Sequence, residues 1–197
     1  MILGILLAAG RGRRIGAPKA LLTLRGETFH ERATGAFRGA GLEVVVVTNA
    51  EVERTLPKRR PGEHRVLNPD PDQPAGMFAS IRLGVEAALA LGAEGVVLLP
   101  VDLPLVTGAD LRTVAAGLGL RTSIVVATHE GRRGHPIGVG RDVMDEILKA
   151  PPDSTLRDIV RLDPARVVEV PVSEGSILGV NTREDLERVS NRAFSVN

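Results

Sequence analysis

The chain has 197 residues, which is enough for one domain with a substantial core. Its formal net charge is +1, so no overall field attracts nucleic acid or a membrane surface. Four Phe with no Trp or Tyr leave few rings for stacking on bases, and the lack of Cys excludes disulfides, thiolate zinc sites and cysteine nucleophiles. We therefore expect a single cytoplasmic domain, residues 1–197, that binds neither nucleic acid nor a membrane.

Short apolar segments alternate with amphipathic stretches along the whole chain. The first segment, MILGILLAAG, is too short to span a bilayer and lacks a preceding basic region, so it predicts a strand and not a signal peptide. Runs such as EVVVVT and GVVLLP lack polar alternation, as expected of strands covered on both faces. The predicted strands are Ile2–Leu7, Val44–Thr48, Arg65–Leu67, Gly95–Pro100, Ser123–Thr128 and Val167–Val170.

Helices are predicted between these strands. Capping-box spacing marks three helix starts, and a further stretch has apolar residues at helical spacing. These signals are Thr28 with Glu31 (the helix stopping at Gly41), Met77–Leu91 before Gly92, Thr107 with Asp110, and Thr182 with Asp185. The alternation predicts an α/β fold, a three-layer α/β/α sandwich with a mostly parallel, mixed sheet. Ligands of such sheets bind at the carboxyl ends of the strands.

The loop after the first strand carries the strongest functional signal. The segment LLAAGRGRRIGAPKALL, Leu6–Leu22, combines glycines with arginines and one lysine, so its N–H groups can wrap phosphates while Arg14 and Lys19 neutralise charge. It is not a Walker A loop, because Lys19 follows Pro18 and no hydroxyl residue follows it. The glycine spacing and Pro18 also exclude a dinucleotide-binding fingerprint. A long irregular phosphate-binding loop remains.

The segment LAAGRGRRIGAPK resembles the signature L-A-[AG]-G-x-G-x-R-[MFI]-G-x-x-K of nucleotidyltransferases with a MobA-like fold. Three later segments and a C-terminal one are similar to other motifs of this family, and the nearest branch is the molybdenum cofactor cytidylyltransferases. These segments are AGMFASIRLGVEAAL, VVLLPVDLPLVT, GHPIGVGRDVMDEI and GVNTREDL. The resemblance covers nearly the whole chain and implies a Rossmann-like nucleotidyltransferase fold.

The resemblance also implies roles for individual residues. The catalytic residues would be Arg14, Lys19 and Asp102, and the acceptor would contact His135 and Arg157. Magnesium would be bound by Asp102 and Asn181, since Mg²⁺ accepts one or two protein oxygens together with phosphate oxygens. The nucleotide would be bound by Leu7, Ala8, Ala9, Gly10, Gly12, Arg14, Lys19, Gly76, Met77, Ser80 and Asp102.

The implied reaction transfers a nucleoside monophosphate to a phosphorylated acceptor and releases pyrophosphate. A phosphate monoester has a second pKa near 6, so it is ionised at neutral pH and needs no general base. The resemblance of LAAG, with Ala9, and of GMFAS and GHPI to the cytidylyltransferase branch implies CTP as donor and molybdopterin as acceptor, and the Ala9 methyl group gives a steric reason for a narrower base pocket. However, the segment Pro151–Arg161 stands where the cytidylyltransferases carry G-D-x-G-A-R. Of that segment's polar residues it retains only an aspartate, Asp153, and an arginine, Arg157.

Other functions therefore stay open. A guanylyltransferase acting on the same cofactor and a transferase acting on a sugar phosphate or another small phosphate are the enzymatic alternatives. A non-catalytic nucleotide-binding regulator is the alternative from a different class. The histidines, His30, His64, His129 and His135, show no HExxH spacing, so no zinc site is expected, and no G-x-S-x-G elbow predicts a serine hydrolase. Nothing in the sequence indicates the oligomeric state.

Overall fold

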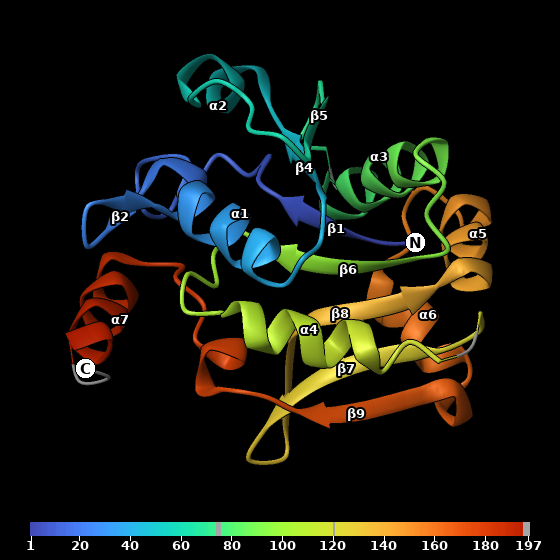
Figure 1. Cartoon of the computed structure of the whole chain (residues 1–197). Helices are drawn as coiled ribbons and strands as arrows, with labels where there is room; N and C mark the ends of the chain where they lie inside the picture. The colour runs from blue at the N-terminus through green and yellow to red at the C-terminus, as the bar shows by residue number, and fades with distance from the viewer. Residues whose placement is uncertain (74–75, 120, 195–197) are drawn as a thin grey trace.

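A seven-stranded sheet forms the centre of the molecule, as the computed structural model shows for residues 1–73, 76–119 and 121–194 (Figure 1). The strand order is β5-β4-β1-β6-β8-β7-β9. These strands are β1 (Ile2–Leu7), β4 (Val44–Thr48), β5 (Glu63–Leu67), β6 (Gly95–Pro100), β7 (Ile124–His129), β8 (Arg132–Gly140) and β9 (Val167–Pro171). A separate two-stranded hairpin, β2 (Thr23–Leu24) and β3 (Glu27–Thr28), follows the first loop.

Most neighbouring strands run parallel, which confirms the predicted mixed sheet. β1 pairs in parallel with β4 and β6, β4 with β5, and β7 with β9. β8 alone runs antiparallel, to β6 on one side and to β7 on the other. The carboxyl ends of β5, β4, β1 and β6 therefore meet along one edge, where open α/β sheets bind their ligands.

Helices cover both faces of the sheet (Figure 1). One face carries α1 and α4, which contact each other, while α3, α5 and α6 lie over the opposite face. The helices are α1 (Phe29–Gly39), α2 (Ala50–Thr55), α3 (Gly76–Ala90), α4 (Gly108–Ala116), α5 (Arg141–Lys149), α6 (Leu156–Leu162) and α7 (Arg183–Phe194), with 3₁₀ turns η1 (Lys19–Leu21), η2 (Pro164–Arg166) and η3 (Glu174–Ile177). Among the described residues, no helix is long and apolar enough to cross a membrane.

The two faces of the sheet bury two aliphatic cores. Because side chains alternate along a strand, β1 sends Leu3 and Ile5 to the core under α3 and α5, and Leu6 to the core under α1 and α4. Phe29 and Phe37 of α1 are completely buried in the second of these cores. The three-layer architecture predicted from the alternation of segments is confirmed.

The predicted helix caps are also present. Thr28 and Glu31 form a complete capping box at the start of α1, and Thr107 and Asp110 form one at the start of α4. The N–H of Asp185 donates to Thr182 Oγ1 at 3.1 Å before α7. α1 ends at Gly39, two residues before Gly41, which takes a positive φ of 76°.

Several elements differ from the prediction. β5 begins two residues before Arg65, β7 begins at Ile124 instead of Ser123, and β9 extends to Pro171. The sequence does not predict β8, because its segment, RRGHPIGVG, contains glycines, a proline and arginines that do not resemble a buried strand. It does not predict the helices α2, α5 and α6 either.

Candidate active site

The glycine-rich loop leaves β1 and curls back on itself. The N–H of Ala8 still pairs with the Val47 carbonyl at 2.8 Å, so the loop begins as an extension of the sheet. The N–H groups of Ile15 and Gly16 then both donate to the Gly12 carbonyl at 2.9 Å, which closes a tight turn. Gly12 has a φ of 60°, and a Cβ at this position would lie 1.9 Å from the Ala17 carbonyl oxygen. Only glycine fits there, and the turn depends on it.

Lys19 lies at the end of this loop and reaches two residues that are remote in sequence. Its Nζ donates to Asp102 Oδ2 at 2.7 Å and to Asn181 Oδ1 at 2.7 Å. The side chains of Lys19 and Asp102 are only 17% and 25% exposed, so this ion pair is partly shielded from water. The N–H of Val180 donates to the Asp102 carbonyl at 2.8 Å, which fixes the segment carrying Asn181 beside Asp102. The predicted loop cation and both predicted metal ligands therefore converge.

A pocket of about 220 Å³ opens where the loop, β6 and the start of α3 meet. It is lined by Leu7, Ala9, Gly10, Gly12, Lys19, Pro71, Gly76, Met77, Ser80, Pro100, Val101 and Asp102. The structure thus brings together all the residues predicted for the nucleotide except Ala8 and Arg14. Ala8 is fully buried behind the wall, and Arg14 lies in the exposed turn outside the pocket, so a phosphate contact for Arg14 stays a prediction. Sequence reasoning missed Pro71, Pro100 and Val101.

The start of α3 forms one wall of this pocket. Gly76 is packed so closely that a Cβ would lie 2.1 Å from the Pro71 carbonyl oxygen. Ser80 is 4% exposed, and its Oγ donates to the Gly76 carbonyl at 2.9 Å. The Ser80 hydroxyl is therefore engaged inside the protein and shapes this wall, whereas Met77 is 66% exposed.

A second, larger pocket adjoins the first and shares Leu7 and Met77 with it. Its volume is about 620 Å³. The predicted acceptor residues His135 and Arg157 both line it, as do Arg133 and Arg161, which the sequence reading did not select. Its apolar part is formed by Leu7, Met77, Phe78, Ile81, Leu98, Val126, Ile137, Leu156 and Val160. This pocket could hold an apolar ring system together with an anionic group.

The charges at the junction of the two pockets influence one another. Burial lowers the pKa of His135, and the negative charge of Asp102 partly opposes that effect. His135 is therefore a neutral imidazole at pH 7. Arg133 pairs with Glu169 at 2.7 Å, whereas Arg157 and Arg161 form no ion pair within the described part of the chain.

The donor set suits a hard divalent cation. Asp102 Oδ2 and Asn181 Oδ1 point at the same nitrogen of Lys19, so one carboxylate and one amide oxygen already face a common cationic centre. Mg²⁺ and Mn²⁺ favour such oxygen ligands and complete their shell with phosphate oxygens and water. Within the described residues no group of three or more His, Cys, Asp or Glu gathers as a metal site. A cation that is also bound by the phosphate oxygens of a nucleotide does not need three such side chains.

A mostly parallel sheet with a glycine-rich loop, an aspartate and a lysine converging at its carboxyl edge defines a nucleotidyltransferase of the α/β class. The chain belongs to the family described as the MobA-like NTP transferase domain, whose model matches residues 4–170. The family predicted from the sequence motifs is thereby confirmed.

Two guanylyltransferases are similar to this chain over different lengths. A probable molybdenum cofactor guanylyltransferase of Opitutus terrae is 37% identical over 115 residues, which are 55% of this chain and 53% of that protein. The molybdenum cofactor guanylyltransferase of Acidiphilium cryptum is 28% identical over 192 residues, 93% of this chain and 91% of that protein. The similarity to the first relative thus spans about half its length, and that to the second nearly all of it.

Two solved structures share the fold. A nucleotidyl transferase from Methanothermobacter thermautotrophicus superposes with a TM-score of 0.83 at 26% identity, covering 100% of this chain and 99% of that chain. The Rv0371c protein of Mycobacterium tuberculosis H37Rv, in complex with manganese, gives a TM-score of 0.75 at 27% identity and covers 96% of this chain and 98% of that chain. The predicted fold class is confirmed by these likenesses.

Proposed function

We propose that this protein transfers the nucleoside monophosphate part of GTP to the phosphate of molybdopterin and releases pyrophosphate. The observation that carries the reaction class is the convergence of Lys19, Asp102 and Asn181 beside the glycine-rich loop. The choice of GTP rests on the two relatives described above, both of which are named guanylyltransferases. They support the guanylyl alternative better than the cytidylyl reading that the sequence motifs favoured.

The residues of the chain would contribute positioning and charge compensation. A divalent cation held by Asp102 and Asn181 would neutralise charge on the triphosphate. The Lys19 ammonium, released from those two side chains, would stabilise the negative charge that accumulates on the leaving pyrophosphate. The N–H groups of the glycine-rich loop would orient the triphosphate for in-line attack.

The larger pocket supports a phosphorylated acceptor with a ring. Its apolar wall can cover a flat heterocycle, and Arg157 and Arg161 are available for an anionic group. An ionised phosphate attacks without a general base, and the neutral His135 beside Asp102 adds no charge to repel or attract it.

One observation keeps CTP as a second candidate. Ala9, the residue of the LAAG segment that favours CTP by resemblance, lies in the wall of the nucleotide pocket and is 3% exposed. A melting-temperature screen with each of the four nucleoside triphosphates and a divalent cation tests the base, because a ligand that binds only the folded chain stabilises it. GTP should give the largest rise. A larger rise in melting temperature with CTP than with GTP would show that CTP is the nucleotide donor.

Turnover tests the reaction class. Pyrophosphate release should require the nucleotide, the cation and molybdopterin, and Asp102→Ala should abolish it while the circular dichroism spectrum is unchanged. Asp145→Asn, which removes an exposed carboxylate that pairs with its helix neighbour Arg141 at 3.6 Å, serves as the matched control and should retain full activity. Unchanged turnover in Asp102→Ala would refute the site. Pyrophosphate release with a sugar phosphate and not with molybdopterin would make the sugar phosphate the acceptor. Nucleotide binding without any pyrophosphate release would indicate a non-catalytic regulator.

A further inference from the structure

Two buried asparagines stand directly behind the nucleotide pocket. Asn49 follows β4 and is 3% exposed, and Asn68 follows β5 and is 1% exposed. The two strands are parallel neighbours, and the N–H of Asn68 donates to the Thr48 carbonyl at 2.7 Å. The asparagines therefore lie at adjacent strand ends, and neither of them lines the pocket.

Asn49 fixes the wall formed by the glycine-rich loop. Its Nδ2 donates to the Ala9 carbonyl at 2.6 Å. Its Oδ1 accepts from the N–H groups of Glu51 and Val52, at 2.8 and 2.9 Å, and so caps α2. One side chain thus joins the start of a helix to the backbone of a pocket residue. A hydrocarbon side chain would leave that buried carbonyl without a partner, which costs about 1–3 kcal/mol.

Asn68 fixes the opposite wall in the same manner. Its Nδ2 donates to Ser80 Oγ at 2.9 Å and approaches the Gly76 carbonyl at 3.4 Å. Its Oδ1 accepts from the N–H of Asp70 at 3.0 Å. Because Ser80 Oγ in turn donates to the Gly76 carbonyl, the amide of Asn68 sets where the first turn of α3 stands.

We propose that Asn49 and Asn68 are positioning residues that set the distance between the two walls of the nucleotide pocket, and with it the affinity for the nucleoside triphosphate. The inference rests on the proposed function, since it assumes that this pocket holds the nucleotide. The amide of Asn49 donates to the glycine-rich loop and accepts from the first turn of α2. The amide of Asn68 donates to α3 and accepts from the N–H of Asp70. The side chains act through Ala9, Gly76 and Ser80 and do not touch the ligand.

Serine variants separate this role from helix capping. In Asn49→Ser the hydroxyl still caps α2, because serine is a favoured N-cap residue, but it is too short to reach the Ala9 carbonyl. In Asn68→Ser the hydroxyl can still accept from Asp70 but not reach Ser80. Each variant should weaken the binding of the Mg²⁺ complex of GTP about tenfold, which corresponds to about 1.4 kcal/mol. If Asn49→Ser does not fold, Asn49→Asp keeps the cap and equally lacks the donor.

Thr48→Val is the matched control. Thr48 is completely buried next to Asn49, but its hydroxyl donates to Glu53 at 3.2 Å and approaches the Val66 carbonyl at 3.5 Å, and neither partner lines the nucleotide pocket. The variant should lose stability towards urea without a change in affinity. Dissociation constants are measured by calorimetry at a temperature where all the proteins are folded, so a merely structural role would not alter them.

The outcomes separate the two proposals. If the wild-type protein binds GTP and both serine variants bind it within twofold of wild type, the positioning role is refuted while the proposed function stands. If the wild-type protein binds neither GTP nor CTP, the proposed function is refuted, and the positioning role that depends on it is refuted as well. An equal loss of affinity in Thr48→Val would also overturn the inference, because general destabilisation would then explain the effect.

Discussion

Lys19 occupies the position between Asp102 and Asn181 that a divalent cation is expected to take. Its ammonium group satisfies both oxygens at 2.7 Å, so the carboxylate is not an uncompensated charge in the free protein. A divalent cation at the same oxygens would be repelled by the ammonium group until Lys19 moves to another anion. The triphosphate offers such an anion. Cation and nucleotide should therefore bind with positive coupling.

This coupling gives a prediction about one residue. Lys19→Met removes the competing charge but keeps most of the side-chain volume. We expect the affinity of the free protein for Mn²⁺ to rise about tenfold, equivalent to about 1.4 kcal/mol, and the affinity for the triphosphate to fall. Titration of free Mn²⁺ by electron paramagnetic resonance measures the first effect without any turnover. Asp102→Asn, the control, should lose Mn²⁺ binding. Weaker Mn²⁺ binding in Lys19→Met would contradict the competition.

The individual site residues were predictable to different degrees. The glycines and Lys19 stand in one contiguous motif, but Lys19 and Asp102 are 83 positions apart, and only the resemblance to a family joined them. Asn49 and Asn68 were missed because each directly follows a strand, where asparagine normally indicates a turn or a cap. Their hydrogen bonds to the glycine-rich loop and to α3 depend on which backbone segments lie next to them in the fold. Periodicity and composition do not reveal those neighbours.

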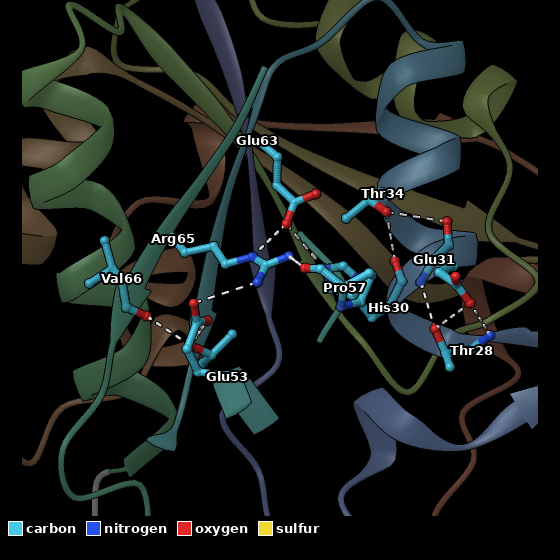
Figure 2. A network of polar contacts seen from close by, with 10 residues as sticks. Thr28, His30, Glu31, Thr34, Glu53, Pro57, Glu63, Arg65 and Val66 are labelled. Carbon is cyan, nitrogen blue, oxygen red and sulfur yellow. Dashed lines mark hydrogen bonds and ion pairs between the residues drawn. The ribbon is translucent and has the colours of Figure 1, made fainter. Parts of the chain in front are cut away.

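Among the structural elements, the edge strand β5 is held by a buried polar network (Figure 2). Arg65 of β5 donates to Glu63 at 2.6 Å and to the Pro57 carbonyl at 2.7 Å, and it approaches Glu53 of α2 at 3.5 Å. His30 of α1 lies 3.5 Å from Glu63. The network thus joins β5 to both α1 and α2.

This network predicts how stability depends on pH. Burial opposes ionisation of Glu63, but the interactions with His30 and Arg65 outweigh burial and lower its pKa from 4.5 to about 2. Because the folded pKa lies below the unfolded one, the contribution is complete above pH 4.5 and disappears as the pH falls to about 2. Glu63→Gln should lower the free energy of unfolding by about 3 kcal/mol at pH 7, as expected for one partner of a buried ion pair, and by less at pH 3.

Urea unfolding followed by circular dichroism at the two pH values measures this difference. Glu94→Gln is the control, since Glu94 forms an exposed pair with Arg121 at 3.3 Å and should change stability by less than about 1 kcal/mol. A loss in Glu63→Gln that is equal at pH 7 and pH 3 would mean that ionisation of Glu63 does not stabilise the fold.

The elements themselves were predictable where burial on both faces dictated the sequence. β1, β4 and β6 have the predicted bounds because short, unbroken runs of aliphatic, mostly β-branched residues are typical of strands covered on both faces. β8 was unpredictable for the opposite reason. Its first residues are exposed or half-buried. β8 runs antiparallel between β6 and β7, so its contacts with those two strands determine its position, and no pattern in its own sequence does. That insertion places His135 and Ile137 of β8 in the wall of the larger pocket.

At the scale of the whole molecule, the sheet continues without a break from β5 to β9. The core under α1 and α4 contains residues from β1, β6 and β7, and so does the core under α3 and α5. Residues early and late in the chain therefore share both cores, although β9 itself is partly exposed. The backbone of β7 also pairs with β8 on one side and with β9 on the other, so the C-terminal strands are joined to the rest of the sheet.

We therefore predict that the 197 residues unfold in one cooperative transition, as a single domain. The calorimetric enthalpy should equal the van't Hoff enthalpy and be about 140 kcal/mol near 60 °C. The chain has no Trp or Tyr, so calorimetry and far-ultraviolet circular dichroism are the suitable probes. The nucleotide that binds should shift the whole transition upward, because both pockets lie on the continuous sheet. Two separate transitions, with only the first shifted by nucleotide, would show that β7 and β9 form an independent unit.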